Sequence, residues 1–388
     1  TRLVDGTIEY MLQLDYIIDS FSKTKVRKMK PFIRNLLRMS VYQIKYMDAV
    51  PDSAVCNEAV KLAKRHKFAQ LSGFVNGVLR NIARNIDSVQ FDTLSIRYSM
   101  PQWIVDRFVA AYGEKKAEEI FKAFHNKSAI SIRTNLTRCT PDELRAMLEA
   151  EGVIVSPVDE LNYAFVISGF DYLNGLQSFR DGLFYVQDIS SMLVAQTAAP
   201  KKGDYVIDVC AAPGGKSTHI AELLQGSGHV LARDLTDTKV DMIEENIERH
   251  GLNNMSAEVW DATVPDADSA EKADILICDL PCSGLGVLGR KKDIRYKMTP
   301  ESVDELAALQ RQILDTVHTY VKPNGVLVYS TCTIDEAENE DNVRWFIEKH
   351  PEFELDKSFA EGTGMKQILP GEHGSDGFFI ARFIKSKL

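Results

Sequence analysis

Two cysteines, Cys282 and Cys332, stand just after apolar segments that are typical of buried β-strands. The first follows ILICD in ILICDLPCSGLG, and the second follows VLVYS in VLVYSTCTIDEAEN. In a parallel sheet the carboxyl ends of such strands meet at one edge, where ligands bind, so we expect both thiols at the same site. A thiolate there can act as a nucleophile and form a covalent intermediate. The alternative is a pair of structural cysteines, but these usually lie within strands, as we expect for Cys278.

A glycine-rich turn in YVIDVCAAPGGKSTHI separates a predicted strand from a predicted helix. Gly214 and Gly215 allow the backbone to approach a ligand closely, and the next helix offers unpaired N–H groups at its N-terminus. The spacing matches neither the dinucleotide fingerprint nor the phosphate-binding loop of ATPases. The turn therefore favours an adenosine-bearing ligand other than NAD or ATP, with a tight structural turn as the alternative.

Three aspartates follow successive predicted strands on the side of the glycine turn. Asp234 ends HVLARD, about 20 residues after the turn, where a carboxylate can accept both hydroxyls of a ribose. Asp261 follows MSAEVW and is placed to reach an adenine amine, and Asp279 ends DILICD. One aspartate at a strand end is usually a cap or turn residue, but three together predict a nucleoside-binding site.

The elements that would position these residues alternate between strand and helix from about residue 186, which is typical of a doubly wound parallel sheet. Residues 126–180 show a β-α-β-β pattern, and residues 1–85 show apolar positions at helical spacing in several short helices. We therefore predict a multi-domain chain with an all-α bundle, a small α/β module and an α/β Rossmann-like domain. The predicted boundaries are 1–88, 89–185 (linker helices and the small module) and 186–388.

The chain has 388 residues, and its net charge of −9 argues by itself against nucleic acid as a partner. The charge is uneven, however: residues 1–90 carry 15 Lys and Arg against 8 Asp and Glu, and the rest carries 31 against 47. A basic end on an acidic body fits a nucleic-acid-binding module, although an uneven solvated surface would give the same counts. The sequence shows no apolar run long enough for a membrane span, its first residues do not read as a secretory signal, and its cysteines lack zinc-site spacing. We therefore expect a cytoplasmic protein without a metal.

With DVCAAPGGKS, DLPCSG and STCT in that order, the chain resembles the RNA cytosine-5 methyltransferase family over essentially its whole length. The stretch VPDSAVCNEAVKLAKRHKFAQLSGFVNGVLRNIAR resembles the NusB-like RNA-binding domain fused to the bacterial members that modify cytosine 967 of 16S rRNA. The resemblance implies a methyltransferase domain that uses S-adenosyl-L-methionine and releases S-adenosyl-L-homocysteine. It also implies 16S rRNA as the partner, modified before full 30S assembly, with no membrane and no metal.

The same resemblance assigns roles to individual residues. Cys332 would be the nucleophile and Cys282 would assist product release. In the DNA cytosine-5 enzymes the PC cysteine attacks instead, so this assignment rests on family membership rather than geometry. Asp279 would stabilise charge on the ring, and Lys216 is a cation that would favour the thiolate. The cofactor would be held by Cys210, Ala211, Ala212, Pro213, Gly214, Gly215, Lys216, Asp234, Asp261 and Asp279.

The implied reaction explains the need for a thiol. Carbon-5 of cytosine is a poor nucleophile, and addition of a thiolate at carbon-6 gives an enamine-like intermediate whose carbon-5 can attack a methyl sulfonium. A base must then remove the carbon-5 proton before the thiol can leave. The target base must also leave any stack to reach the site, which unpaired RNA makes easier.

RNA contacts are expected from two further segments that match the family. Arg133 and Asn135 stand in RTNLTR, and Arg290 and Lys292 stand in the basic segment GVLGRKKDIRYK, where they are candidates for phosphate contacts. The departures from the family pattern remove no reacting group: they are Leu280 in the PC motif, Thr333 after the TC motif and Arg233 before the ribose aspartate.

Other functions remain open at this point. One keeps the chemistry but acts on tRNA, against which the NusB-like stretch speaks, since the rRNA members carry it. Another is a non-catalytic RNA-binding factor of the antitermination type, which would need neither the cofactor motif nor the thiols. Methylation of an exocyclic nitrogen is disfavoured, because that reaction normally goes with an Asn-Pro-Pro-aromatic motif where this chain has Asp-Leu-Pro-Cys.

Overall fold

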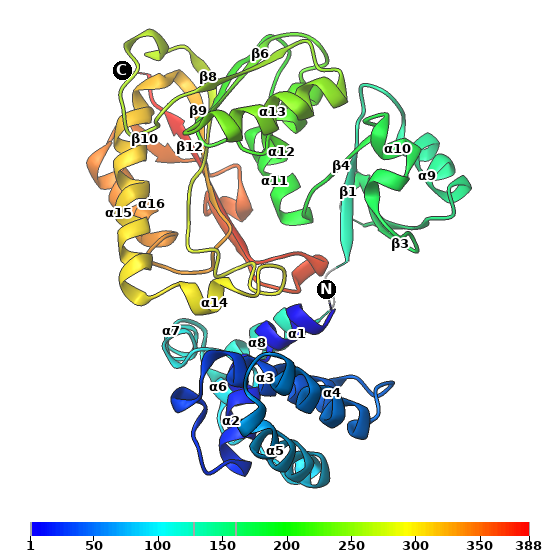
Figure 1. Ribbon diagram of the computed structural model, residues 1–388. Coiled ribbons are helices and arrows are strands. Elements are labelled where there is room, and N and C mark those ends of the chain that lie inside the picture. Colours follow the sequence, from blue (N-terminus) through cyan, green and yellow to red (C-terminus); the bar gives the residue numbers. More distant parts are fainter. Residues whose placement is uncertain (1, 127–128, 160, 388) are drawn as a thin grey trace. The chain divides into compact units, whose positions relative to one another are not determined.

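The computed structural model describes residues 2–126, 129–159 and 161–387 (Figure 1). The chain forms two compact units, which are described separately. The first comprises residues 1–125 and the segment 290–297, and the second comprises residues 126–289 and 298–388. The second unit is thus interrupted in sequence by a short segment that packs with the N-terminal helices.

The first unit is built from helices. They are α1 (Arg2–Glu9), α2 (Met11–Phe21), α3 (Pro31–Tyr46), α4 (Asp52–Arg65), α5 (Ser72–Asn85), α6 (Leu94–Arg97), α7 (Gln102–Tyr112), α8 (Glu114–His125) and α14 (Ile294–Lys297). Pro31 begins α3, and the apolar residues of this helix, such as Ile33, Leu37 and Val41, are buried in one core with residues of α2, α4 and α5. Helices α6 to α8 belong to this unit, whereas the sequence predicts that the first domain ends at residue 88.

A small four-stranded sheet opens the second unit. Its strands are β1 (Ile130–Thr134), β2 (Ile154–Val158), β3 (Leu161–Ser168) and β4 (Phe184–Val186), paired antiparallel in the order β2-β3-β1-β4. Helices α9 (Pro141–Ala150) and α10 (Gln177–Arg180) accompany it. Thr140 and Glu143 form a capping box at the start of α9, which satisfies two of the N–H groups that the helix itself leaves unpaired.

An eight-stranded sheet forms the rest of the second unit. Its strands are β5 (Tyr205–Asp208), β6 (His229–Asp234), β7 (Met255–Val259), β8 (Ala273–Asp279), β9 (Val321–Thr331), β10 (Phe353–Leu355), β11 (Met365–Ile368) and β12 (Phe378–Lys385). The order is β10-β12-β9-β8-β5-β6-β7, with β11 also paired to β12. Strands β5 to β9 are parallel to their neighbours in this group, and β12 runs antiparallel to β9. The chain order reverses between β5 and β8, which is where a doubly wound sheet binds its ligand.

Helices cover both faces of this sheet (Figure 1). They are α11 (Ile189–Ala198), α12 (Gly215–Leu223), α13 (Asp237–His250), α15 (Pro300–Val317) and α16 (Glu340–Lys349). Strand residues alternate between two cores: Val206 and Ile277 pack with α11, α12 and α13, whereas Ile207 and Cys278 pack with α15 and α16. The alternation follows from the two-residue period of a strand, and it buries Cys278 within β8, as predicted.

The architecture confirms the predicted fold class of a helical bundle, a small α/β module and a Rossmann-like domain. Within the described residues, no helix combines the length and the apolar character that crossing a membrane requires.

Candidate active site

The two cysteines predicted to share a site are in contact. Register pairs Asp279 of β8 with Ser330 of β9, so the loops that carry Cys282 and Cys332 leave the sheet at the same edge. Their Sγ atoms are 3.1 Å apart, and the Cys332 N–H donates to Cys282 Sγ at 3.3 Å. The hydrogen bond with Cys332, together with burial, holds the pKa of the Cys282 thiol well above its ordinary value. One thiol of the pair is therefore kept protonated beside the other.

A half-buried ion pair lies at the same strand ends. Lys216, in the first turn of α12, donates to Asp279 Oδ2 at 2.6 Å, and the Ser330 hydroxyl donates to Asp279 Oδ1 at 2.7 Å. Burial acts to lower the pKa of Lys216, but Asp279 outweighs it and Cys332 adds to the effect, so this pKa is raised. Lys216 thus stays an ammonium, and its position favours negative charge on the neighbouring sulfur.

The Asp234 carboxylate accepts a hydrogen bond from the backbone of the glycine turn. Gly214 has a φ of +100°, a conformation that favours glycine, and precedes the first turn of α12. Asp234 is buried at the end of β6, where its Oδ2 accepts from the Ala212 N–H at 2.9 Å. Its Oδ1 accepts from the Leu235 N–H and from Lys239 Nζ, at 2.8 and 2.7 Å. A carboxylate fixed beside a glycine turn suits the ribose of a nucleoside ligand.

Asp261 follows β7 at the neighbouring strand end. The Trp260 N–H donates to the backbone oxygen of Asp234 at 2.9 Å, which places the two aspartate loops side by side. Asp261 Oδ1 accepts from the hydroxyl and the N–H of Thr263, and these hydrogen bonds lower the pKa of Asp261. Asp261 is therefore an anion that can accept a hydrogen bond from an amine.

Asp208, at the end of β5, is a residue of this region that the sequence analysis missed. Its side chain is buried, and Ser217 donates to Oδ2 at 2.5 Å. Within the described part of the chain, Oδ1 has no hydrogen-bond partner. Burial raises the pKa of Asp208 to about 7. Asp208 ends a strand, as Asp234 and Asp279 do, and this position is the signal that could have identified it. Its motif DVCAAPGG was interpreted only through its glycines.

Beneath the cysteine loops lies a buried polar network centred on Glu338. Its carboxylate accepts from the Ser283 N–H and from Gln310 Nε2, each at 2.9 Å, and from the Ser283 hydroxyl. Gln310 also donates to the backbone oxygen of Pro281 at 2.9 Å, and Ser283 contacts the Thr333 hydroxyl at 2.9 Å. Burial raises the pKa of Glu338. The network fixes the residues on either side of Cys282, so it positions that thiol.

The structure contradicts the expectation that Arg133 and Asn135 contact RNA, because both are fully buried. Arg133 forms an ion pair with Glu222 and donates to Gln187 Oε1 at 2.9 Å and to Thr218 Oγ1 at 3.1 Å. Asn135 donates to the Gly182 oxygen at 2.9 Å. The Arg133 bonds join β1 of the small sheet to α12, and Asn135 also donates to the backbone oxygen of His250 at 3.2 Å, at the end of α13, so both residues hold the second unit together.

The basic segment after the PC motif lies in the first unit. Lys292 forms an ion pair with Glu9, a buried carboxylate that also contacts His125 Nδ1 at 3.0 Å. Arg295 is buried in the same unit, and Arg290 is exposed. A phosphate contact by Arg290 remains a prediction, whereas Lys292 has a carboxylate partner within the protein.

A Rossmann-like sheet whose reversal point holds a glycine turn, strand-end carboxylates and two adjacent thiols suits an enzyme that binds a nucleoside-bearing cofactor. Three families match the chain: 16S rRNA methyltransferase RsmB/F over residues 195–384, the NusB family over 1–84, and the RsmF/B-like ferredoxin-like domain over 100–170. The chain belongs to the RsmB/F family of 16S rRNA methyltransferases. S-adenosyl-L-methionine, predicted from the sequence, is therefore confirmed as its cofactor.

Individual relatives align over the whole chain. The probable ribosomal RNA small subunit methyltransferase B of Bacillus subtilis (strain 168) is 38% identical, covering 99% of this chain and 90% of the relative. Ribosomal RNA small subunit methyltransferase B of Salmonella paratyphi A is 32% identical, covering 99% and 89%. Among solved structures, PH0851 is 27% identical with a TM-score of 0.85, covering 100% of this chain and 89% of that one.

Proposed function

We propose that the protein methylates carbon-5 of a cytosine in 16S rRNA, at cytosine 967, through a covalent adduct between Cys332 and carbon-6. The observation that carries the proposal is the contact of Cys282 and Cys332, 3.1 Å between sulfurs, beside the ion pair of Lys216 and Asp279. A methyltransferase acting on an oxygen or nitrogen needs no thiol, and carbon-5 of cytosine is a target that does. The names of the relatives support small-subunit rRNA as the substrate.

The cofactor's sulfonium supplies an electrophilic methyl group when it is bound. Asp234 and Asp261 would hold its ribose and adenine, because both carboxyl groups lie at neighbouring strand ends, and the turn at Gly214 would let the backbone approach it. These residues fit an adenosine-bearing cofactor, because carboxylate oxygens can accept hydrogen bonds from the ribose hydroxyls and from the adenine amine.

In the first step, the Cys332 thiolate adds to carbon-6 and the electron pair of the 5,6 double bond moves into the ring. Lys216 stabilises the thiolate before attack, ring nitrogen 3 takes up a proton from solvent as the electron pair arrives, and Asp279 accepts hydrogen bonds from that N–H and from the exocyclic amine. Carbon-5 then takes the methyl group. The two charged side chains remain paired throughout, so the site needs little reorganisation during the reaction.

In the second step, Cys282 loses its own proton to solvent and, as a thiolate, removes the carbon-5 proton, and the electron pair restores the double bond as the bond from carbon-6 to the Cys332 sulfur breaks. The hydrogen bond with Cys332 is the largest cause of the raised pKa of Cys282. That hydrogen bond is lost once the Cys332 sulfur is bonded to carbon-6. Formation of the adduct therefore makes the Cys282 thiolate easier to form at the stage where a base is required.

Two variants test the roles of the thiols. We expect Cys332→Ala to abolish methyl transfer and Cys282→Ala to accumulate an RNA–protein adduct that survives denaturation. The adduct is detected by its mobility in a denaturing gel. An adduct that accumulates in Cys332→Ala instead would reverse the two roles.

The substrate is tested by incubating the protein with S-adenosyl-L-methionine and unmodified RNA, then mapping 5-methylcytosine by bisulfite sequencing. We expect one new site in small-subunit rRNA, at cytosine 967, with naked rRNA a better substrate than assembled 30S particles. A site in tRNA would keep the mechanism and overturn the substrate. The absence of a new site in both naked rRNA and assembly intermediates would refute the proposal.

A further inference from the structure

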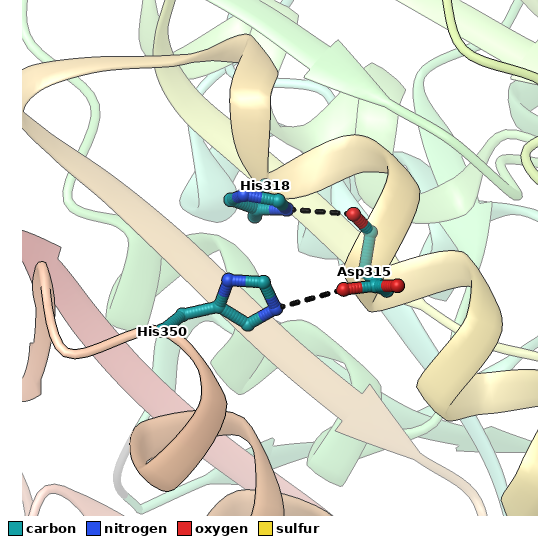
Figure 2. A group of neighbouring side chains, drawn as sticks. All are labelled: Asp315, His318 and His350. Atoms are coloured by element: carbon teal, nitrogen blue, oxygen red, sulfur yellow. Dashed lines mark hydrogen bonds and ion pairs between the residues drawn. The ribbon is translucent and has the colours of Figure 1, made fainter.

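A cluster of histidine and carboxylate side chains lies at the end of β9 opposite to Cys332 (Figure 2). Asp315 comes from the last turn of α15, His318 begins the 3-10 helix η6 (His318–Tyr320), and His350 follows α16. Because β9 begins at Val321 and has 11 residues, the cluster is about 30 Å from the thiols. It takes no part in the chemistry proposed above.

The spacing of the cluster fits a metal ion. One ligand atom from each of Asp315, His318 and His350 can be chosen so that all three lie within 4.8 Å of one another. His350 Nε2 is 3.2 Å from Asp315 Oδ1, and the two imidazole rings are 3.9 Å apart between centroids. Ligands of a tetrahedral zinc ion, with bonds of about 2.0–2.1 Å, are separated by about 3.3 Å. Small side-chain movements would therefore complete a first coordination shell.

The hydrogen bonds leave the right nitrogen atoms available. His318 Nδ1 donates to the backbone oxygen of Asp315 at 2.8 Å, so the lone pair of His318 lies on Nε2 (Figure 2). His350 has only 6% of its surface exposed, and its Nε2 faces Asp315 Oδ1 at 3.2 Å (Figure 2). A metal ion bound between these two atoms would take the place of this contact, because an imidazole nitrogen and a carboxylate oxygen are both zinc ligands. A backbone or carboxylate partner on the other ring nitrogen is the usual arrangement around metal-bound histidine.

The charges of the cluster also favour a cation. Glu352 Oε1 is 3.7 Å from His318 Nε2 and from His350 Nδ1, which adds a second carboxylate to Asp315. Lys349 Nζ lies 2.9 Å from Asp315 Oδ1. Its side chain is about half exposed, so the ammonium can turn to solvent when a metal takes its place.

We propose that Asp315, His318 and His350 bind a divalent transition metal of the zinc class, with Glu352 or water as the fourth ligand. Two imidazoles with a carboxylate are a ligand set that suits such ions rather than magnesium or calcium. The metal would join the end of α15 to the end of α16. The expectation from the sequence that no metal is bound rests on the spacing of the cysteines. That spacing says nothing about a site made of histidine and aspartate side chains.

The test uses the full chain after chelation, titrated with Zn²⁺ by calorimetry and with Co²⁺ by visible absorption. We expect one ion per chain and the d–d bands of nitrogen and oxygen ligands, without the intense near-ultraviolet bands of thiolate ligands. The cobalt spectrum therefore separates this site from Cys282 and Cys332. We also expect Zn²⁺ to raise Tm.

Two variants and a matched control localise the site. Asp315→Asn changes a side chain that is 42% exposed and should fold normally, and His318→Gln removes one imidazole. We expect both to bind Zn²⁺ at least about 10- to 100-fold more weakly and to lose the increase in Tm, whereas His373→Gln, an exposed histidine elsewhere, behaves as wild type. No stoichiometric binding by wild type, thiolate bands in the cobalt spectrum, or unchanged affinity in both variants would overturn the proposal.

Discussion

Removal of the Glu338 carboxylate tests whether the buried network positions Cys282. Glu338→Ala leaves the Ser283 N–H and one N–H of Gln310 without their acceptor, in a region where both residues are buried. A buried unsatisfied donor costs about 1–3 kcal/mol, so the two together cost about 4 kcal/mol. For a unit of this size that corresponds to a decrease in Tm of about 8–16 °C. Glu338→Gln should be mild, because the amide oxygen can accept from both donors and its NH₂ can donate to the Ser283 hydroxyl.

The assay combines calorimetric melting with single-turnover methyl transfer. We expect Glu338→Ala to lower kcat by about 100-fold even well below its Tm, since a displacement of about 1 Å at a catalytic group has such an effect. Glu336→Ala is the control: this glutamate is in the same loop, but its side chain is 60% exposed, and surface changes usually stay within about 0.5 kcal/mol. Equal Tm values for the two alanine variants would refute the reasoning. Equal damage by Gln and Ala at 338 would show that the charge matters rather than the acceptor.

Three further predictions concern the ionisable side chains of Lys216, Arg133 and His219. Lys216→Met should lower kcat by about 10²–10³-fold by removing the cation beside Cys332, and adduct formation at the wild-type rate would contradict this. Arg133→Met should cost about 3–5 kcal/mol of stability in urea unfolding, because Glu222 is left buried and unpaired; lost RNA affinity with unchanged stability would restore Arg133 as an RNA ligand. Burial lowers the pKa of His219 well below 6.5, so on acidification the unfolded state takes up this proton before the folded state does. The free energy of unfolding therefore falls as the pH drops below 6.5, by up to about 1.4 kcal/mol per pH unit for this group. His219→Gln should flatten that dependence, and an unchanged slope would show that other groups cause it.

The parts of the site that could be predicted from the sequence are those set by strand ends. Cys282, Cys332, Asp234 and Asp279 each follow an apolar run, and the parallel sheet brings such positions to one edge whatever the details of packing. The contact of the two sulfurs follows from the neighbouring positions of β8 and β9. Local pattern and fold class were enough to find these residues.

The residues that could not be predicted depend on tertiary contacts. Glu338 stands in the acidic stretch DEAENED, which reads as solvated surface, yet it is fully buried because Ser283 and Gln310 supply donors from distant segments. Arg133 was expected to contact RNA because it stands in the RTNLTR stretch that matches the family, and its partner Glu222 lies far along the chain. A charged side chain carries no local signal that distinguishes a buried pair from an exposed one.

The segment 290–297 limits how this protein can be divided or recombined. It begins eight residues after Cys282 in the chain, yet Lys292 and Arg295 find their partners around Glu9 near the N-terminus. A gene fragment that starts after residue 125 would encode the whole catalytic sheet, but it would leave Lys292 without the Glu9 carboxylate and Arg295 without the Glu9 backbone oxygen. A truncated or recombined chain therefore needs changes within residues 290–297 that replace these contacts.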